Sequence, residues 1–219
     1  IGYGEGEMYV GSDAIALAPL TNRIAYLEEG DCAVLTRTSV EITDRNGALA
    51  NRAIKSVQID STRIDKAGHK HFMAKEIAEQ PGVIGAAIGH YLTPEGEINI
   101  SAQDIDFTQF DRIVMVACGT ASYACFTAKY WFEQIARLPV EIDVASEFRY
   151  REPPIPPRTL AVFVSQSGET ADTLAALRYC EGKAARILSI VNVPESSIAR
   201  ESDLALPIHA GVEVGVAST

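Results

Sequence analysis

The sequence predicts an α/β fold in which a doubly wound, parallel five-stranded sheet follows a short antiparallel β segment. Three observations predict it: apolar β-branched runs along the later part of the chain, helix-like segments between most of these runs, and alternating strand patterns with an Asn-Gly turn near the start. Short runs that are apolar throughout are typical of parallel strands, because helices cover both faces of such a sheet.

The first part of the chain, residues 1–57, has the pattern of strands and turns. Residues 32–36 and 39–43 are strand-like, and Asn46-Gly47 is a turn signal typical of hairpins. We expect an antiparallel element there. Residues 58–70 are polar and offer few groups for burial, which favours a linker.

The second domain is expected over residues 71–219. A helical pattern starts at Phe72 and runs to Pro81, where the proline is expected to break or kink the helix. The strands of the parallel sheet are expected at the apolar runs that follow, at residues 113–117, 140–144, 160–164, 187–191 and 204–208.

Composition excludes several classes of partner. The 219 residues carry a net charge of −10, which argues against binding of nucleic acid or of an anionic membrane surface. No apolar run approaches the length of a membrane span, and no export signal begins the chain. The cysteines Cys32, Cys118, Cys125 and Cys180 lie far apart without a C-x-x-C pair, so reduced thiols, no metal site and a cytoplasmic location are expected.

Two loops that follow predicted strands share one composition. Residues 118–122 and 165–170 are rich in Gly and hydroxyl side chains and contain no Lys or Arg. Because a helix N-terminus offers unpaired N–H groups and a partial positive charge, such loops suit a phosphate monoester. The alternative is that the Ser and Thr residues are ordinary N-caps. Neither loop has the G-x-x-x-x-G-K-[ST] pattern of a nucleotide site.

Several segments resemble the glutamine–fructose-6-phosphate aminotransferase family. They include residues 165–174 (SQSGETADTL), 118–120 (CGT), 145–151 (ASEFRYR), 215–219 (GVAST) and, upstream, 27–31 (LEEGD) and 73–81 (MAKEIAEQP). The resemblance implies that residues 1–57 are the end of a glutaminase-like domain of the N-terminal-nucleophile type. It also implies that residues 71–219 are the first of two sugar-isomerase (SIS) domains, in an enzyme that converts fructose 6-phosphate and glutamine to glucosamine 6-phosphate.

The resemblance also implies a binding site. Ser165, Gln166, Ser167 and Thr170 would hold the sugar phosphate beside Thr120, and Val216 and Ser218 would contact the sugar. The family has a serine directly after Cys-Gly-Thr, whereas this chain has Ala121, so either Ser122 or backbone N–H groups would take its place.

The resemblance implies that the reacting groups of that family lie outside the 219 residues, in the missing part of the glutaminase domain and in the second SIS domain. The start at Ile1 and the end at Thr219 on a small-residue run are likewise expected of a piece of a longer protein. We therefore expect no catalytic residue and no cofactor in this chain, which alone would be inactive. The expected partners are fructose 6-phosphate or glucosamine 6-phosphate and a second copy of the chain, paired through the SIS domain. The alternatives are a phosphosugar-sensing SIS regulatory module and a related SIS deglycase or isomerase.

Other residues have structural explanations. The Glu169 carboxylate is expected to lie in the first turn of a helix, where it interacts with the helix dipole, and Cys118 is expected to be a small buried side chain. His69 and His71 lack the partners of a metal site. The aromatic cluster at residues 130–132 is expected in the core or at a subunit interface.

Overall fold

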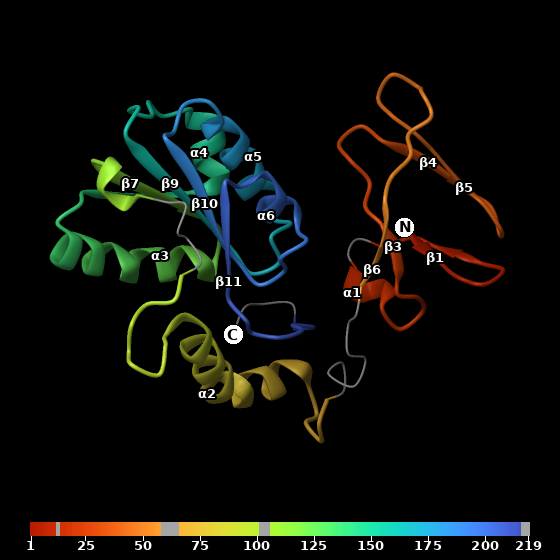
Figure 1. The fold of residues 1–219 in the computed structure, drawn as a ribbon, viewed down its shortest axis with the longest axis horizontal. Helices are drawn as coiled ribbons and strands as arrows, with labels where there is room; N and C mark the ends of the chain where they lie inside the picture. The colour runs from red at the N-terminus through yellow and green to blue at the C-terminus, as the bar shows by residue number, and fades with distance from the viewer. Residues whose placement is uncertain (12–13, 58–65, 101–105, 216–219) are drawn as a thin grey trace. The chain divides into compact units, whose positions relative to one another are not determined.

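The computed structural model describes residues 1–11, 14–57, 66–100 and 106–215, and the chain divides into two compact units (Figure 1). Unit 1 comprises Ile1–Ala67 and unit 2 comprises Gly68–Thr219. Most of the expected linker at residues 58–70 lies outside the described residues.

Unit 1 is antiparallel, as the sequence predicted. One sheet has the order β2-β1-β3-β6, built from β1 (Gly2–Tyr3), β2 (Met8–Tyr9), β3 (Arg23–Ala25) and β6 (Ile54–Ser56). Strands β4 (Cys32–Leu35) and β5 (Val40–Thr43) form a separate antiparallel pair. The short helix α1 (Ala14–Leu17) packs Leu17 against Ile24, which gives this unit a small core.

Unit 2 contains the predicted parallel five-stranded sheet. Its strands are β7 (Arg112–Ala117), β8 (Val140–Val144), β9 (Thr159–Ser165), β10 (Arg186–Val191) and β11 (Leu204–Pro207), in the order β11-β10-β9-β7-β8. The chain leaves β7 toward β8 at one edge and then returns to the other side of β7 with β9. The direction of winding therefore reverses between β7 and β9.

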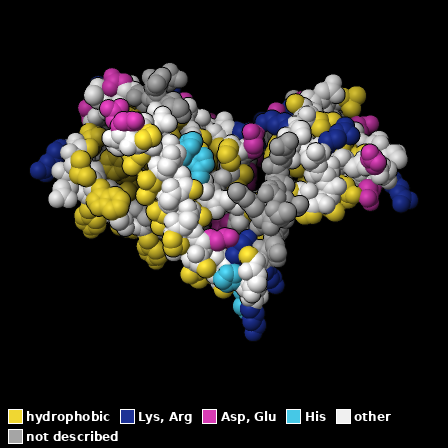
Figure 2. Space-filling model, turned by 60° about the horizontal axis from the view of Figure 1, so that its bottom comes forward, with side chains coloured by type: hydrophobic (Ala, Val, Ile, Leu, Met, Phe, Trp, Pro, Cys, Tyr) yellow, Lys and Arg dark blue, Asp and Glu magenta, His cyan; other side chains and the backbone are white. Residues whose placement is uncertain are grey.

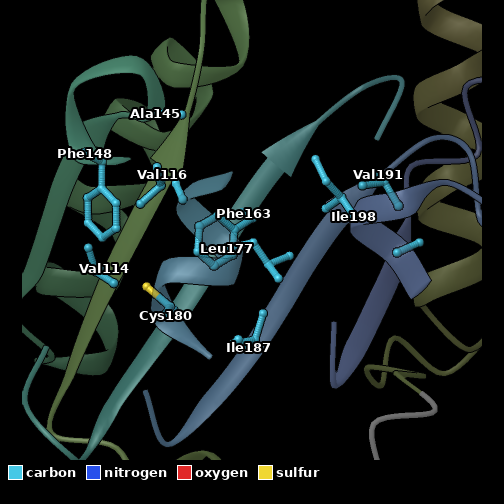
Figure 3. Packing of buried hydrophobic residues seen from close by; sticks show 13 residues of the cluster. Val114, Val116, Ala145, Phe148, Phe163, Leu177, Cys180, Ile187, Val191 and Ile198 are labelled. Carbon is cyan, nitrogen blue, oxygen red and sulfur yellow. The ribbon is translucent and has the colours of Figure 1, made fainter. Parts of the chain in front are cut away.

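Helices cover both faces of this sheet. Helix α3 (Thr120–Trp131), followed by a π-helical turn (Phe132–Ala136), packs on one face, and α4 (Ala145–Arg151), α5 (Ala171–Cys180) and α6 (Ser197–Glu201) pack on the other. Alternate residues of β7 supply the two cores: Val114 and Val116 join Phe163 and Leu177 on the α5 side (Figure 3), whereas Met115 lies on the α3 side. This alternation explains why the whole strand is apolar.

Helix α2 (Phe72–Tyr91) continues through Pro81 for another ten residues, so the proline does not break the helix, which was one of its two expected effects. Proline removes one N–H donor from the helix. Pro81 is exposed, so water can reach the backbone there. The isoleucines of α2 are also exposed (Ile77 53%, Ile84 58%, Ile88 52%), and its buried residues are Lys75 and Glu76.

The aromatic cluster at residues 130–132 is not in the core, which corrects that part of the prediction. Tyr130, Trp131 and Phe132 are exposed at the end of α3. Figure 2 shows other hydrophobic side chains on the surface of the molecule as well. Among the described ranges, no helix combines the length and the apolar character that crossing a bilayer requires.

Candidate functional site

The two hydroxyl-rich loops emerge beside each other at the carboxyl edge of the sheet. β7 and β9 are neighbours, with Ala117 paired to Val164, so the segments that follow them start at the same height. This is also the point where the winding of the sheet reverses. In open parallel sheets, ligands bind beyond the carboxyl ends of the strands at such a switch point.

The loop after β9, residues 165–170, is a tight turn leading into α5. The hydroxyls of Ser165 and Thr170 are 2.9 Å apart, and Ser165 Oγ accepts a hydrogen bond from Gly168 N at 3.1 Å. Ser167 Oγ accepts from Glu169 N at 3.2 Å and is exposed. Thr170 is the N-cap residue of α5, although its side chain makes no capping bond. The structure thus brings together the predicted hydroxyls of this loop at the start of one helix.

Neighbouring segments hold this loop in place. Gln166 O accepts from Asn192 N at 2.9 Å, and Gly168 O accepts from Ile198 N at 3.0 Å. The Glu169 carboxylate accepts from Ser197 N at 2.8 Å, at the start of α6. This corrects the expectation that Glu169 lies in the first turn of its own helix, because α5 begins only at Ala171.

The loop after β7 places Thr120 and Ser122 differently. Thr120 is the first residue of α3 and is exposed, next to the N-cap residue Gly119. Ser122 is 6% exposed, and its hydroxyl donates to Gly119 O at 2.6 Å. The Ser122 hydroxyl proton is thus used within the loop.

A cavity of about 330 Å³ lies next to both loops. Thr120, Ala121, Ala124, Val164 and Gln166 line it from the loops and their flanking elements; Glu76, Glu79, Gln80 and Val83 line it from α2; and Ile208, Ala210, Val212 and Glu213 line it from the segment after β11. None of these lining residues is Lys or Arg. Burial and the nearby Glu76 carboxylate raise the pKa of Glu213.

The segment after β11, residues 208–215, is called the strap from here on. It contains no helix or strand, and two side chains hold it. The Asn192 amide accepts from Ala210 N at 2.8 Å and donates to Gly211 O at 2.6 Å, and the Glu76 carboxylate accepts from the N–H groups of Val214 and Gly215. Val216 and Ser218, the remaining predicted site residues, lie outside the described residues.

Sequence reasoning missed Glu76 and Asn192. Asn192 directly follows β10, so the rule that found the other two loops, that ligand sites gather where parallel strands end, also points to it. Glu76 gave no such signal, because a glutamate within a helix is ordinarily exposed. No group of three or more metal-ligating side chains occurs in the part of the chain that the structure describes, and Cys118 is half-buried.

Comparison with known proteins adds the family. Residues 106–219 match the SIS domain family. The whole chain is 57% identical to a glutamine–fructose-6-phosphate aminotransferase (isomerizing) of Brucella abortus and 54% identical to that of Agrobacterium fabrum. The chain spans 36% of the length of these relatives.

Solved structures agree with this comparison. The C-terminal domain of glucosamine-fructose-6-phosphate aminotransferase from Francisella tularensis matches with a TM-score of 0.66 and 47% identity, over 71% of this chain and 44% of that chain. A glucosamine-6-phosphate deaminase from Thermotoga maritima matches with a TM-score of 0.56 and 24% identity, over 68% of this chain and 43% of that one, which shows the shared fold alone.

Proposed function

The chain belongs to the SIS domain family, and we propose that its second unit binds a sugar phosphate for an enzyme that makes glucosamine 6-phosphate and glutamate from fructose 6-phosphate and glutamine. The observation that carries this proposal is the meeting of two hydroxyl-rich loops at the switch point between β7 and β9. The relatives that match along the whole chain are named for the same substrate.

In this proposal the phosphate rests on neutral donors. Ser165, Ser167 and Thr170 surround the start of α5, and Thr120 begins α3, so two helix N-termini face the same edge of the sheet. N–H groups at helix starts carry partial positive charge and stabilise an anion without a lysine or arginine. Ser122 stays outside the set of direct contacts because its hydroxyl is buried on Gly119 O.

Gln166 and the cavity complete the proposed site. The loop of residues 165–170 is called the phosphate loop from here on. Its Gln166 lines the cavity, which suits a contact of the Gln166 amide with a sugar hydroxyl. Val216 and Ser218 are proposed to contact the sugar because they directly follow the strap that lines the same cavity. The catalytic groups are proposed to come from other parts of the enzyme.

The same relationship extends to the rest of the chain. We propose that residues 1–57 are the end of a glutaminase-like domain, residues 58–70 a linker and residues 71–219 the first SIS domain of a cytoplasmic homodimer. The identity of relatives along the entire chain supports this organisation. The antiparallel sheet of unit 1 counts against a regulator in which a helix-turn-helix precedes the SIS domain.

The test is ligand-induced thermal stabilisation of the 219-residue chain. A ligand that binds the folded state raises its stability by roughly 2.7 kcal/mol at a hundred times its Kd. Fructose 6-phosphate and glucosamine 6-phosphate are expected to raise Tm, and unphosphorylated glucosamine is not. Ser167→Ala and Thr170→Ala should reduce the shift.

Thr127→Ala is the matched control, because the Thr127 hydroxyl is exposed on α3 and, among the described residues, bonds only to the carbonyl of Tyr123 in its own helix. This variant should keep the full shift. Equal stabilisation by glucosamine and its 6-phosphate, or no stabilisation by either sugar phosphate, would rule out the proposed site.

A further inference from the structure

Helix α2 buries charge and exposes apolar residues. Glu76 is 9% exposed, whereas isoleucines of the same helix face solvent. A buried carboxylate loses its hydration, which destabilises the fold by several kcal/mol unless hydrogen bonds replace the water. The hydrogen-bond donors to the Glu76 carboxylate therefore show which segment of the chain this side chain fixes in place.

The partners of Glu76 lie at the far end of the chain. Its Oε1 accepts hydrogen bonds from Val214 N at 2.8 Å and from Gly215 N at 2.9 Å, residues 138 and 139 positions later. Successive N–H groups that point to one carboxylate oxygen fix both the position and the direction of the backbone. Hydrogen bonds to a charged acceptor are also stronger than those between neutral groups.

The second oxygen of Glu76 lies against the strap without a hydrogen-bond partner in the described residues. Glu76 Oε2 is buried, and a Cβ built on Gly215 would overlap it and lie 3.3 Å from the carboxyl carbon. The strap thus approaches the carboxylate as closely as a residue without a side chain permits.

The contacts of the strap connect it with the phosphate loop. Asn192 N donates to Gln166 O, and the Asn192 side chain holds Ala210 and Gly211. Glu76 holds the other end of the strap. Gln166, Glu76 and the strap all line the same cavity, so these hydrogen bonds tie three segments of its wall to one another.

We infer that Glu76 is a positioning residue of the sugar-phosphate site, which holds the strap as the wall against the sugar while the phosphate rests on residues 118–120 and 165–170. This inference rests on the proposed function. It assigns to Glu76 an effect on binding of the sugar portion and none on binding of the phosphate.

The chemistry of the contact explains why a carboxylate stands here. An apolar side chain would pack as well, but it would leave the N–H groups of Val214 and Gly215 without an acceptor in a half-buried segment. A shorter polar side chain on α2 would not reach the strap. The arrangement requires an acceptor at the end of a long side chain, which Glu and Gln share.

The experiment compares two ligands by isothermal titration calorimetry. Glucosamine 6-phosphate tests the whole site, and inorganic phosphate tests the loops alone. Glu76→Ala is expected to weaken glucosamine 6-phosphate binding on the order of tenfold, because the strap loses two charge-assisted hydrogen bonds. Inorganic phosphate binding should change less than about twofold, since its contacts lie on the other loops.

The conservative variant and a control separate positioning from loss of fold. Glu76→Gln keeps an oxygen acceptor and should bind glucosamine 6-phosphate within about threefold of the unchanged chain. Glu147→Gln removes an exposed helical carboxylate on α4 and should change neither ligand.

Gly215→Ala tests the same contact from the strap. The added methyl overlaps Glu76 Oε2, so this variant should weaken glucosamine 6-phosphate binding and spare phosphate binding. Gly82→Ala on α2, where an added Cβ meets nothing within 4 Å, is its matched control and should leave both affinities unchanged.

The outcomes are distinct. If the unchanged chain binds neither ligand, the proposed function fails, and this inference fails with it. If the unchanged chain binds both ligands and Glu76→Ala weakens both equally or neither, Glu76 has a general structural role and the inference alone is overturned. Selective loss of glucosamine 6-phosphate binding in Glu76→Ala and Gly215→Ala supports it.

Discussion

One added methyl group at Gly168 tests whether the turn of the phosphate loop depends on close packing against α6. Gly168 has φ +68°, in the left-handed region, and it is buried. A Cβ there would overlap Oγ and Cβ of Ser196 and lie 3.5 Å from Val191 Cγ1. Ser196 is 1% exposed, so its atoms have no free space to move into.

Two effects add in Gly168→Ala. A left-handed backbone costs a non-glycine residue about 1–2 kcal/mol. Overpacking a well-packed site costs a further 1–3 kcal/mol or so. Gly182→Ala separates them, because Gly182 has the same φ of +68° and an added Cβ there meets nothing within 4 Å. We expect a loss of about 2–5 kcal/mol at Gly168 and about 1–2 kcal/mol at Gly182.

Urea unfolding followed by tryptophan fluorescence measures these losses in unit 2. Trp131 is the single tryptophan of the chain and lies on α3, so its signal reports this unit. Ser196→Gly in the Gly168→Ala background removes both overlapping atoms and should recover the excess loss. Since Ser196 Oγ has no hydrogen-bond partner among the described residues, little else is lost with it.

The binding consequence follows from the same geometry. Gly168 N donates to Ser165 Oγ, so a shifted turn also displaces the hydroxyls proposed to hold phosphate. Gly168→Ala should therefore abolish the Tm shift caused by glucosamine 6-phosphate, and Gly182→Ala should keep it. Equal losses of stability in the two variants, with no recovery by Ser196→Gly, would refute the overlap as the cause.

Two other predictions concern groups outside the phosphate loop. Burial and the facing His90 ring, 3.9 Å away between centroids, lower the pKa of His209 from 6.5. The unfolded chain then binds this proton more readily than the folded chain, so stability should be lost as the pH falls from 6.5 through the folded pKa. The variant His209→Asn removes this proton site, and asparagine tolerates the φ of +60° at position 209. Its Tm should fall less between pH 7.5 and 5 than that of the unchanged chain, and an equal fall would contradict this explanation. Thr173 is fully buried, and its Oγ1 has no hydrogen-bond partner among the described residues. Thr173→Val should therefore raise the free energy of unfolding, measured by urea titration, by about 1 kcal/mol. A decrease would instead reveal a partner for the hydroxyl.

The sheet was predictable because its inner strands β7, β9 and β10 are mostly buried on both faces, whereas the edge strands β8 and β11 are only partly buried. The run at 113–117 became β7 (Arg112–Ala117), and the run at 204–208 became β11 (Leu204–Pro207). A strand covered on both faces has apolar residues at every position, so its limits are visible in the sequence. Strand order at the switch point was not visible, because it depends on which side of β7 the later strands pair.

The helices were less predictable, and α3 shows why. Its inward face is made of small side chains, Ala121, Cys125 and Ala128, which allow the helix to lie close to the sheet. The aromatic residues at 130–132 are left on the outside. Size and hydrophobicity alone therefore indicated the wrong face. In α2, likewise, the buried positions are Lys75 and Glu76, and the partner of Glu76 is a distant backbone segment that no local pattern indicates.

The distribution of charge around the cavity determines how a sugar phosphate would lie in it. Glu76 and Glu213 line the cavity with carboxylates, whereas the two loops contribute the neutral side chains of Thr120, Ala121 and Gln166. Like charges about 4 Å apart near a protein surface repel by roughly 4 kcal/mol, so a phosphate is strongly disfavoured beside these carboxylates. Burial and then the neighbouring Glu76 carboxylate raise the pKa of Glu213, so both effects act against a further negative charge there. In the proposed binding mode the phosphate therefore faces the helix starts, which leaves the sugar hydroxyls to the strap and to the carboxylate oxygens, which accept hydrogen bonds.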